Sequence, residues 1–510
     1  MRLTLLLKGI GILEARGEPE GEVTSVCYDS RQCRPGSLFV AIAGLKADGR
    51  LFIADALARG AGFIVHEGEF SPPHGVTAIR VHDSRRVLGT LARNFFGNPS
   101  AALTLLGVVG TNGKTTVTYL LESILRAAGC AVGVLGTVNY RYGGELFPAP
   151  NTTPESFEMH RILREMADRG VSHVVAEVSS HAIDLRRVDE CAFDLGIFTN
   201  LTQDHLDYHR TMENYFQAKK RFFSEVLPGG GKERPIRMVI NADDPWGQRI
   251  LREAAGGRVT YGLETPCDAT AEAFHLSLGG IEATLRLGTE RLEIASPLMG
   301  RFNLYNILAA AAAAWALEVP GRFIREGLAA LAHVPGRLEK VSTAGQPAVF
   351  VDYAHTDDAL RRVLQNLAGF RTGRIITVFG CGGDRDRGKR PLMGEAATAY
   401  SDLTIVTSDN PRTEDPLAII AEIEPGIRVP KFSAADPWPP PPGERGYRVI
   451  PDRKEAIASA IGTAEVADIV LIAGKGHEDY QIIGTEKFPF DDSLIAKEAL
   501  SRWQANRGGS

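Results

Sequence analysis

The chain has 510 residues and a formal net charge of -5, with 44% hydrophobic and 23% charged residues, a balance typical of globular proteins. This length exceeds what one hydrophobic core supports and indicates about three domains. The negative charge excludes a general binder of nucleic acids or anionic membranes, because either would need a basic surface.

The first residues and the cysteines bear on the compartment. The segment MRLTLLLKGI holds one short apolar run that ends at Lys8, too brief for the apolar region of a signal peptide. No apolar run reaches the ~18 residues that a membrane span needs. The six cysteines are scattered, without CxxC pairs or zinc-type spacing. We therefore expect a cytoplasmic protein with reduced thiols and no membrane span.

The first block of the chain alternates predicted strands and helices. Strands are predicted at 36–42, 61–67 and 76–82, and helices at 52–60 and 85–96. Gly97, Asn98 and Pro99 break the last helix, so the first domain is predicted to span residues 1–99.

The second block opens with a predicted strand at 103–109. Further strands are predicted at 171–178, 193–201 and 236–242. The block closes with an alanine-rich helix through 309–314, because alanine favours helix and permits close packing, followed by the turn VPGR. A central domain is predicted over 100–335.

The third block predicts strands that begin near residues 348, 374, 403 and 468. Each strand breaks into a polar loop that contains glycine or aspartate. In open parallel sheets, ligands bind at this carboxyl edge. The pattern predicts a C-terminal domain over 336–510 and an α/β fold throughout.

A glycine-rich loop with the sequence GTNGKTT follows the strand 103–109 and precedes a helical pattern. Its backbone N–H groups can turn towards phosphate, Lys114 can reach the terminal phosphates and Thr115 can ligate Mg²⁺. The alternative is a strand–helix turn without a ligand. Val108 replaces the first glycine of the GxxxxGK[ST] pattern and no NKxD motif is present, which disfavours a GTPase or a standard kinase. We assign phosphate binding to Gly110, Thr111, Asn112, Gly113, Lys114, Thr115 and Thr116.

Two metal-ligand candidates follow strands of the same block. Glu177 ends the strand 171–178, and His205 lies in the loop after the strand 193–201. Neighbouring parallel strands share one carboxyl edge, so both side chains can meet Thr115 around a metal ion. A single Glu or His is usually a surface or satisfied core residue, but this pair favours Mg²⁺, although Mg²⁺ prefers oxygen to histidine nitrogen.

The loop GTNGKTT resembles the nucleotide loop of the Mur ligase family, ATP-dependent enzymes that form amide bonds in peptidoglycan precursor synthesis. Folylpolyglutamate synthetases share this loop, but the rest of the chain favours the Mur ligases. In the family's order it contains YDSRQCRPGSLFVAI, NTTPE, EVSSHAIDLRRV, TNLTQDHLDYHRTMENYFQAKKRFF, GRFNLYN, VPGRLE, DYAHTDDAL, GCGGDRDRGKRPLMG, SDNPR and GKGHEDYQ. The similarity runs from Cys27 to Asp492, nearly the whole chain.

The resemblance is to the member that adds meso-2,6-diaminopimelate. It implies an N-terminal domain that binds the UDP substrate, a central ATPase domain with a P-loop-type parallel sheet, and a C-terminal Rossmann-like domain that receives the amino acid. The implied reaction joins meso-diaminopimelate to the D-Glu carboxylate of UDP-N-acetylmuramoyl-L-alanyl-D-glutamate through an acyl phosphate, with ATP and Mg²⁺. The implied partners are these small molecules, without nucleic acid.

Three rivals remain open at this point. A sister ligase would add L-lysine or another diamine. A folylpolyglutamate synthetase is disfavoured by the N-terminal block of the UDP type. A non-catalytic nucleotide-binding module is disfavoured because candidate ligands are present in both the central and the C-terminal blocks.

Residue pattern and resemblance disagree about Lys219 and Lys220. Both lie on a predicted amphipathic helix, where the residue pattern indicates two solvated lysines. The resemblance implies that Lys219 is carbamylated by CO₂, which turns a cation into an anionic oxygen ligand for a second Mg²⁺. Lys220 is the alternative if the alignment is shifted by one residue.

For the nucleotide, the resemblance implies contacts from both asparagines of NLYN, from Arg337 and Asp352, and from His355. Asn306 is the stronger candidate and Asn303 the second. Helix capping is the alternative role of these asparagines.

For the UDP substrate, the resemblance implies a larger polar set: Tyr28, Ser30, Leu45, Lys46, Ala47, Asn151, Thr152, Thr153, Ser179 and Arg187. Hydroxyls, amides and an arginine suit uracil, diphosphate and carboxylate, although Ser and Thr at loop starts often serve only as caps or turn formers. Leu185 stands where the family often has glutamine, which puts one substrate hydrogen bond in doubt.

The choice of amino acid is predicted to depend on SDNPR. Its residues Asp409, Asn410, Pro411 and Arg412 are joined by candidates in neighbouring loops: Arg390, Gly474 and Glu478. The planar fork of Arg412 can hold the distal carboxylate that distinguishes meso-diaminopimelate from L-lysine. We expect Asp409 and Asn410 to supply oxygens for ammonium groups and Pro411 to fix the turn. The alternative is an Asp-Asn-Pro turn with a solvated arginine.

Overall fold

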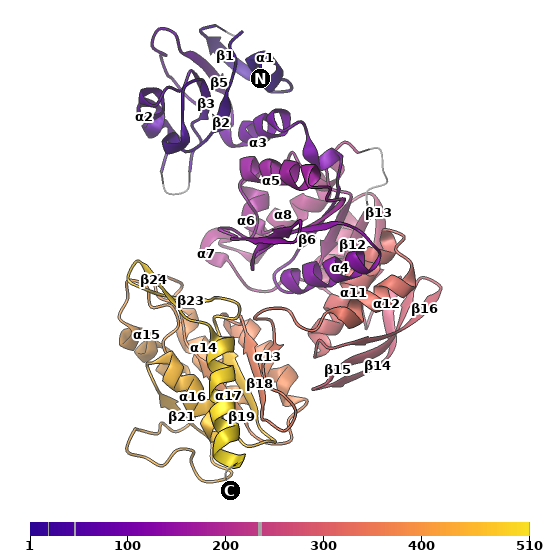
Figure 1. Cartoon of the computed structure of the whole chain (residues 1–510), viewed down its shortest axis with the longest axis vertical. Coiled ribbons are helices and arrows are strands. Elements are labelled where there is room, and N and C mark those ends of the chain that lie inside the picture. The colour runs from indigo at the N-terminus through magenta and orange to yellow at the C-terminus, as the bar shows by residue number, and fades with distance from the viewer. Residues whose placement is uncertain (19, 45–46, 233–236, 509–510) are drawn as a thin grey trace.

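The computed structural model describes residues 1–18, 20–44, 47–232 and 237–508. Three sheets follow one another along the chain, and Figure 1 shows them arranged along the long axis of the molecule. Parallel strands dominate each sheet and helices pack on the sheets, which confirms the predicted α/β fold with three domains. Leu45 and Lys46 of the predicted UDP site, and Ile236 of a predicted strand, lie outside the described residues.

The N-terminal sheet has five strands in the order β1-β5-β4-β3-β2. The strands are β1 (Ile12–Arg16), β2 (Ser25–Cys27), β3 (Ser37–Val40), β4 (Phe63–His66) and β5 (Thr77–Val81). The helices are α1 (Leu3–Leu6), α2 (Ile53–Ala58) and α3 (Ser84–Phe95). The predicted strands 36–42, 61–67 and 76–82 are confirmed as β3, β4 and β5, while β1 is exposed and carries no apolar run that predicts it.

The central sheet has eleven strands in the order β16-β15-β14-β13-β12-β11-β6-β10-β7-β8-β9. The parallel strands are β6 (Thr104–Val109), β7 (Val132–Leu135), β10 (His173–Glu177), β11 (Leu195–Phe198), β12 (Arg237–Asn241) and β13 (Gly257–Tyr261). Antiparallel strands extend both edges: β8 (Tyr140–Tyr142), β9 (Glu145–Phe147), β14 (Ala269–Ser277), β15 (Gly280–Leu287) and β16 (Glu290–Ser296). The strands predicted at 103–109, 171–178 and 193–201 are confirmed as β6, β10 and β11.

Helices cover both faces of this sheet, and the side chains of strand β6 are buried on both faces. Leu106 and Val108 pack with α4 (Lys114–Ala127), α11 (Arg301–Ala316) and α12 (Gly321–Ala330). Leu105 and Val109 pack on the opposite face, because successive side chains alternate along a strand. The helices there are α5 (Ser156–Asp168), α6 (Ser180–Asp184), α7 (Leu206–His209), α8 (Met212–Arg221), α9 (Leu227–Gly229) and α10 (Pro245–Glu253). The alanine run of α11 is fully buried, which confirms the predicted close-packed helix.

The C-terminal sheet has six strands in the order β17-β18-β22-β19-β20-β21. The strands are β17 (Glu339–Lys340), β18 (Ala348–Asp352), β19 (Ile375–Phe379), β20 (Leu403–Val406), β21 (Gly446–Val449) and β22 (Ile469–Ala473), and only β17 pairs antiparallel. One face carries α13 (Asp357–Ala368), α14 (Lys389–Tyr400) and α15 (Pro416–Ile423), and the other α16 (Arg453–Thr463) and α17 (Asp492–Gly508). This two-sided coverage is the predicted Rossmann-like arrangement.

A hairpin of β23 (Tyr480–Ile483) and β24 (Glu486–Pro489) lies beside the C-terminal sheet. No helix in the described part of the chain has the length and apolar character needed to cross a membrane.

Candidate active site

The carboxyl ends of four adjacent strands bring the central site together. Strand β10 lies between β6 and β7, and the register pairs Glu177 with Val108. The loop GTNGKTT follows β6, and β11 lies on its other side. Glu177 is therefore next to the predicted phosphate loop, as the sequence indicated.

The phosphate loop has the backbone shape that its glycines permit. Gly113 has a φ of +88° and precedes α4, and a Cβ there would overlap Oδ1 of Asn306. The backbone N–H groups of Thr111 and Asn112 donate to the backbone and side-chain oxygens of Asn200, at 2.8 and 3.0 Å. The loop is thus anchored to the end of β11 and presents the N-terminus of the 14-residue helix α4, which includes Thr116 in its first turn. A helix N-terminus of this kind attracts anions.

Two lysines meet at one backbone carbonyl of this loop. Nζ of Lys114 donates to the oxygens of Gly110 and Thr111 at 3.0 and 2.9 Å, and Nζ of Lys219 donates to the same Gly110 oxygen at 2.8 Å. Burial is the main cause that lowers the pKa of both amines, and Lys114 lowers the pKa of Lys219 further. The site therefore places two amine donors at the loop where phosphate is expected.

The expectation that Lys219 is solvated is wrong. Its side chain is 1% exposed, and its ammonium lies over the Tyr215 ring, because residues four apart share one face of helix α8. Lys220 lies elsewhere on this helix and pairs with Glu253 at 2.7 Å. Only Lys219 reaches the loop.

Glu177 is buried among oxygen and nitrogen donors. Its carboxylate accepts the hydroxyl of Thr115 at 3.2 Å, and Nη2 of Arg337 in turn donates to that Thr115 oxygen at 3.3 Å. Both carboxylate oxygens also accept from Thr137, from its N–H at 2.9 Å and its hydroxyl at 3.0 Å. A carboxylate beside a hydroxyl is the hard-oxygen chemistry that suits Mg²⁺.

His205 has the protonation state that a metal ligand needs. Partial burial lowers the pKa of His205, while the Asp204 carboxylate, 3.5 Å from Nε2, acts in the opposite direction; the net shift is downward, which favours a neutral imidazole. The residue has a φ of +53°, and its ring lies 4.9 Å from that of His181. Among the described residues, no three His, Cys, Asp or Glu side chains form a metal cluster. The predicted set has only two such groups, Glu177 and His205, and completes its ligands with a hydroxyl and a modified lysine.

The predicted nucleotide residues lie at the junction of the central and C-terminal domains. The Asn306 side chain adjoins Gly113 and donates to Oδ1 of Asn303 at 3.0 Å, while Asn303 donates to the Met299 carbonyl at 2.9 Å. Asn303 therefore supports Asn306, the stronger candidate. The guanidinium of Arg337 lies 4.7 Å from the centre of the Tyr353 ring.

Asp352 has a role that the sequence did not indicate. Its carboxylate accepts the N–H groups of Leu338 and Ala354 at 2.6 and 2.8 Å, and burial raises its pKa. It thus fixes the chain segment that follows Arg337. His355 is exposed, and its Nδ1 lies 2.9 Å from the Tyr353 carbonyl.

Four predicted UDP-substrate residues lie together beside Glu177. The Thr153 hydroxyl donates to the Glu177 carbonyl at 2.8 Å and accepts the N–H of Ser179 at 3.0 Å. Nη1 of Arg187 donates to the Thr153 carbonyl at 3.2 Å, and the Thr152 hydroxyl lies 3.1 Å from that of Thr137. Ser179 also caps helix α6, as the alternative role of serine anticipated.

The remaining predicted UDP residues lie further out. The Asn151 carbonyl accepts the Tyr140 hydroxyl at 2.5 Å. Ser30 is buried and Ala47 exposed in the N-terminal domain. Tyr28 donates its hydroxyl to Glu158 at 2.7 Å, which connects the N-terminal and central domains. Leu185, the departure from the family pattern, is half-buried after helix α6.

In the C-terminal domain, the loop after β20 meets the loop after β22. Nδ2 of Asn410 donates to Glu478 at 2.7 Å, and a Cβ at Gly474 would overlap the Asp409 carboxylate. The Pro411 carbonyl accepts the N–H of Glu414 at 3.1 Å, so this residue lies in the predicted turn. Arg412 donates to the Gly383 carbonyl at 2.8 Å and has no carboxylate partner among the described residues. Its guanidinium can therefore bind a ligand carboxylate.

Two expectations for this site need correction. The Asn410 oxygen already accepts from Nζ of Lys475 at 3.2 Å and from the N–H of Ile482 at 2.9 Å, so Asn410 offers a ligand an N–H rather than an oxygen. Arg390 is fully buried, and its guanidinium donates to Glu414 and Glu422 at 2.8–2.9 Å. Arg390 is engaged in holding the adjacent loops together.

The sequence missed three residues that touch the predicted ones. Thr137 follows β7, a strand that was not predicted because it is short. With β7 predicted, the shared carboxyl edge of parallel strands would have placed Thr137 beside Glu177. Lys475 lies within GKGHE, where only Gly474 and Glu478 were chosen. His181 lies between His205 and Tyr208 and carries no pattern that distinguishes it from a core histidine.

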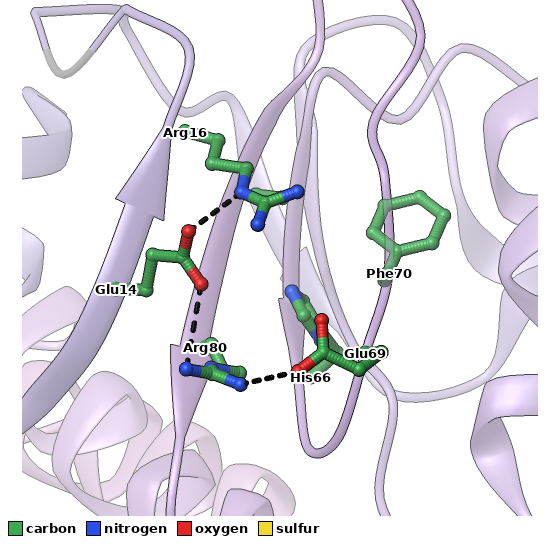
Figure 2. Close-up of a pocket in the computed structure, with 7 residues that line it drawn as sticks. Glu14, Arg16, His66, Glu69, Phe70 and Arg80 are labelled. Carbon is green, nitrogen blue, oxygen red and sulfur yellow. Dashed lines mark hydrogen bonds and ion pairs between the residues drawn. The ribbon is translucent and has the colours of Figure 1, made fainter.

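A second polar cluster lies on the N-terminal sheet, across β1, β5 and β4 (Figure 2). Glu14 pairs with Arg16 at 2.7 Å and with Arg80 at 3.4 Å, and Arg80 also pairs with Glu69 at 2.8 Å. Each guanidinium therefore already faces a carboxylate. The cluster contains none of the predicted site residues, and we assign it to strand pairing.

Comparisons with known proteins agree with this geometry. Three family models match: Mur ligase family, catalytic domain, at 22–96; Mur ligase middle domain at 108–314; and Mur ligase, glutamate ligase domain, at 336–476. The chain is 49% identical over 504 residues to the UDP-N-acetylmuramoyl-L-alanyl-D-glutamate–2,6-diaminopimelate ligase of Geobacter metallireducens, covering 96% of this chain and 97% of that protein. It is 48% identical to the ligase of the same name from Geobacter sulfurreducens, and all of both chains is covered.

Solved structures give the same result. A structure of a UDP-N-acetylmuramoyl-L-alanyl-D-glutamate–2,6-diaminopimelate ligase matches with a TM-score of 0.69 and 31% identity, and covers 98% of this chain and 99% of that one. MurF from Acinetobacter baumannii matches with a TM-score of 0.63 at 18% identity, over 92% of this chain and 95% of that one, which shows the shared fold alone. The chain belongs to the Mur ligase family.

Proposed function

We propose that this chain is an ATP-dependent ligase that adds meso-2,6-diaminopimelate to the D-Glu carboxylate of UDP-N-acetylmuramoyl-L-alanyl-D-glutamate, in the cytoplasm and during peptidoglycan precursor synthesis. The observation that carries the proposal is the meeting of Lys114, Thr115 and Glu177 beside the polar residues of the predicted UDP site. Relatives that are 41–49% identical carry the corresponding name. All six cysteines are free thiols, as a reducing compartment requires.

The three domains divide the substrates between them. We assign residues 1–99 to the UDP end of the substrate, 100–335 to ATP, and 336–510 to the amino acid. The diaminopimelate ligase of Geobacter sulfurreducens covers all of this chain, including the N-terminal sheet. This coverage supports the assignment of the N-terminal domain to the UDP substrate.

The chemistry begins with activation of a poor electrophile. ATP supplies the phosphoryl group: a D-Glu carboxylate oxygen attacks the γ-phosphorus, and ADP leaves. Bound Mg²⁺ would neutralise phosphate charge. The amine of diaminopimelate then attacks the acyl carbon, loses a proton, and phosphate leaves with the C–O electron pair. Lys114 and the N-terminus of α4 stabilise the transferred phosphate, and Thr115, Glu177 and His205 would hold Mg²⁺.

Lys219 has the chemistry that carbamylation needs. Only a neutral amine attacks CO₂, and burial lowers the pKa of Lys219 well below the usual lysine value. The reaction joins the amine nitrogen to CO₂ and releases one proton. The product is an anion in a place where Lys114 makes a second cation unfavourable, and it would add an oxygen ligand for Mg²⁺.

The C-terminal loops would bind the charged groups at both ends of the amino acid. Arg412, which has no carboxylate partner among the described residues, and the N–H of Asn410 offer donors for a carboxylate, while Asp409 and Glu478 offer acceptors for ammonium groups. L-Lysine lacks the distal carboxylate and would leave Arg412 unpaired. This difference favours meso-diaminopimelate.

The test is product identification. The protein is incubated with ATP, UDP-N-acetylmuramoyl-L-alanyl-D-glutamate and single amino acids, and the products are identified by mass spectrometry while ADP is measured. We expect a product heavier by one diaminopimelate less one water, with one ADP per product. ADP formation without an amide product, or a product only with L-lysine, would contradict the proposal.

A further inference from the structure

Thr137 holds both oxygens of Glu177. Its backbone N–H donates to Oε1 at 2.9 Å, and its hydroxyl donates to Oε2 at 3.0 Å. The preceding residue is Gly136, where a Cβ would overlap Oε1, so the chain approaches the carboxylate as closely as only glycine permits. One residue thus fixes the rotation of the whole carboxylate group.

The hydroxyl of Thr137 also lies 3.1 Å from the hydroxyl of Thr152, so Thr152, Thr137 and Glu177 form a row of hydrogen bonds. The direction of each bond in this row follows from the carboxylate at its end. An ionised carboxylate only accepts, so the single Thr137 hydrogen points to Glu177. The Thr137 oxygen must then accept the hydrogen of Thr152. Thr152 is left with lone pairs only, and it can accept from a ligand but not donate to it.

Glu177 retains one site for a cation in this arrangement. Oε2 accepts the hydroxyls of Thr115 and Thr137, which uses both of its lone pairs, whereas Oε1 accepts only the Thr137 N–H. The oxygen that remains open is therefore selected by Thr137.

We propose that Thr137 is a positioning residue with two roles: it orients Glu177 so that Oε1 faces Mg²⁺, and it makes Thr152 an acceptor for an N–H or O–H of the UDP substrate. This inference rests on the proposed function, because it takes Glu177 as a metal ligand and Thr152 as a substrate contact. It joins the metal site to the substrate site through one hydroxyl.

The test compares Thr137→Val with Thr137→Ser. Valine keeps the shape and the backbone N–H but lacks the hydroxyl, while serine restores it. The control is Thr398→Val, because Thr398 is a buried threonine whose hydroxyl donates within helix α14, to Gly394 at 2.8 Å and Glu395 at 3.4 Å. The first measurement is Mn²⁺ binding by electron paramagnetic resonance with a non-hydrolysable ATP analogue. The second is Tm, and the third is kcat and the KM for each substrate.

We expect Thr137→Val to weaken Mn²⁺ binding and lower kcat by about 10–100-fold, as loss of a hydrogen bond to a metal-binding carboxylate does. Thr137→Ser should recover most of both, and Thr398→Val should change only Tm. Thr152→Val should raise the KM for the UDP substrate in the wild type but add less in Thr137→Val, since that variant no longer fixes the Thr152 hydrogen.

The outcomes separate this inference from the proposed function. If Thr137→Val binds Mn²⁺ as tightly as the wild type, or if only its Tm falls, the positioning role is overturned. Equal effects of Thr152→Val in both backgrounds would overturn the second role. If the wild type itself neither binds Mn²⁺ with nucleotide nor forms product, the proposed function fails before Thr137 is tested.

Discussion

Arg412 is the residue on which the choice of amino acid should depend. One guanidinium nitrogen donates to the Gly383 carbonyl at 2.8 Å, which aims the fork, and the remaining N–H groups have no carboxylate partner among the described residues. Removing one partner of a buried charged hydrogen bond costs about 2–5 kcal/mol, which is roughly 30- to 4,000-fold in kcat/KM. We expect Arg412→Ala to lose this factor with meso-diaminopimelate and to change little with L-lysine.

The assay is the initial rate of phosphate release with each amino acid, at saturating ATP and UDP substrate. Arg412 has a φ of +53°. Its N–H donates to the Ile482 carbonyl at 3.1 Å, and its carbonyl accepts the N–H of Gly484 at 2.7 Å, which hold this conformation. Because glycine adopts positive φ without strain, Arg412→Gly tests the loss of the side chain alone. Arg428→Ala is the control, because this exposed arginine donates to the Pro425 carbonyl and has no carboxylate partner in the described part of the chain. Equal kcat/KM for both amino acids in the wild type, or normal activity of Arg412→Gly, would refute the reasoning.

Four further predictions concern other parts of the molecule. Lys114→Ala should abolish ADP formation with an unchanged circular dichroism spectrum, and full activity in this folded variant would exclude the phosphate loop. Lys219→Ala should be nearly inactive and partly rescued by short-chain carboxylates that replace the carbamate oxygens; normal rates without them would contradict carbamylation. Lys475→Met should raise the KM for meso-diaminopimelate about tenfold or more, because Lys475 holds Asn410 and Glu478, while Lys487→Met, in the adjacent hairpin, should not. Burial lowers the pKa of His160 to about 3 in the folded protein, whereas the unfolded chain takes up this proton near the usual value of 6.5. The free energy of unfolding should therefore fall as the pH drops from 6.5 towards 3, and urea titrations should show a smaller fall in His160→Gln.

The sequence predicted those elements whose residue pattern is compatible with only one type of secondary structure. The strands β6 and β10 are short apolar runs that end in a polar loop, and the position of Glu177 followed from parallel pairing alone. Lys219 could not be placed in this way, because its burial depends on the loop that packs against α8 from another part of the chain. The same limit applies to Asn410, whose oxygen is occupied by Lys475 and by the hairpin strand β23. A residue type shows what a side chain can donate or accept, but only the fold shows which of these groups is already used.

The bonds of the two lysines give a reason for carbamylation at Lys219. Both side-chain nitrogens donate to the Gly110 carbonyl, and burial followed by the charge of Lys114 lowers the pKa of Lys219. In the proposed function, phosphate would compete with the Gly110 and Thr111 carbonyls for the Lys114 amine, which would remove one of the two donors at Gly110. In the proposed carbamate, the Lys219 nitrogen would keep one N–H, and the two added oxygens would be acceptors that the Gly110 carbonyl cannot donate to. The carbamate would be an anion near Lys114. It would attract the Lys114 amine, whereas an unmodified Lys219 ammonium would repel it. We therefore expect the proposed modification to matter for phosphoryl transfer more than for nucleotide binding, so Lys219→Ala should bind ATP while failing to transfer its phosphate.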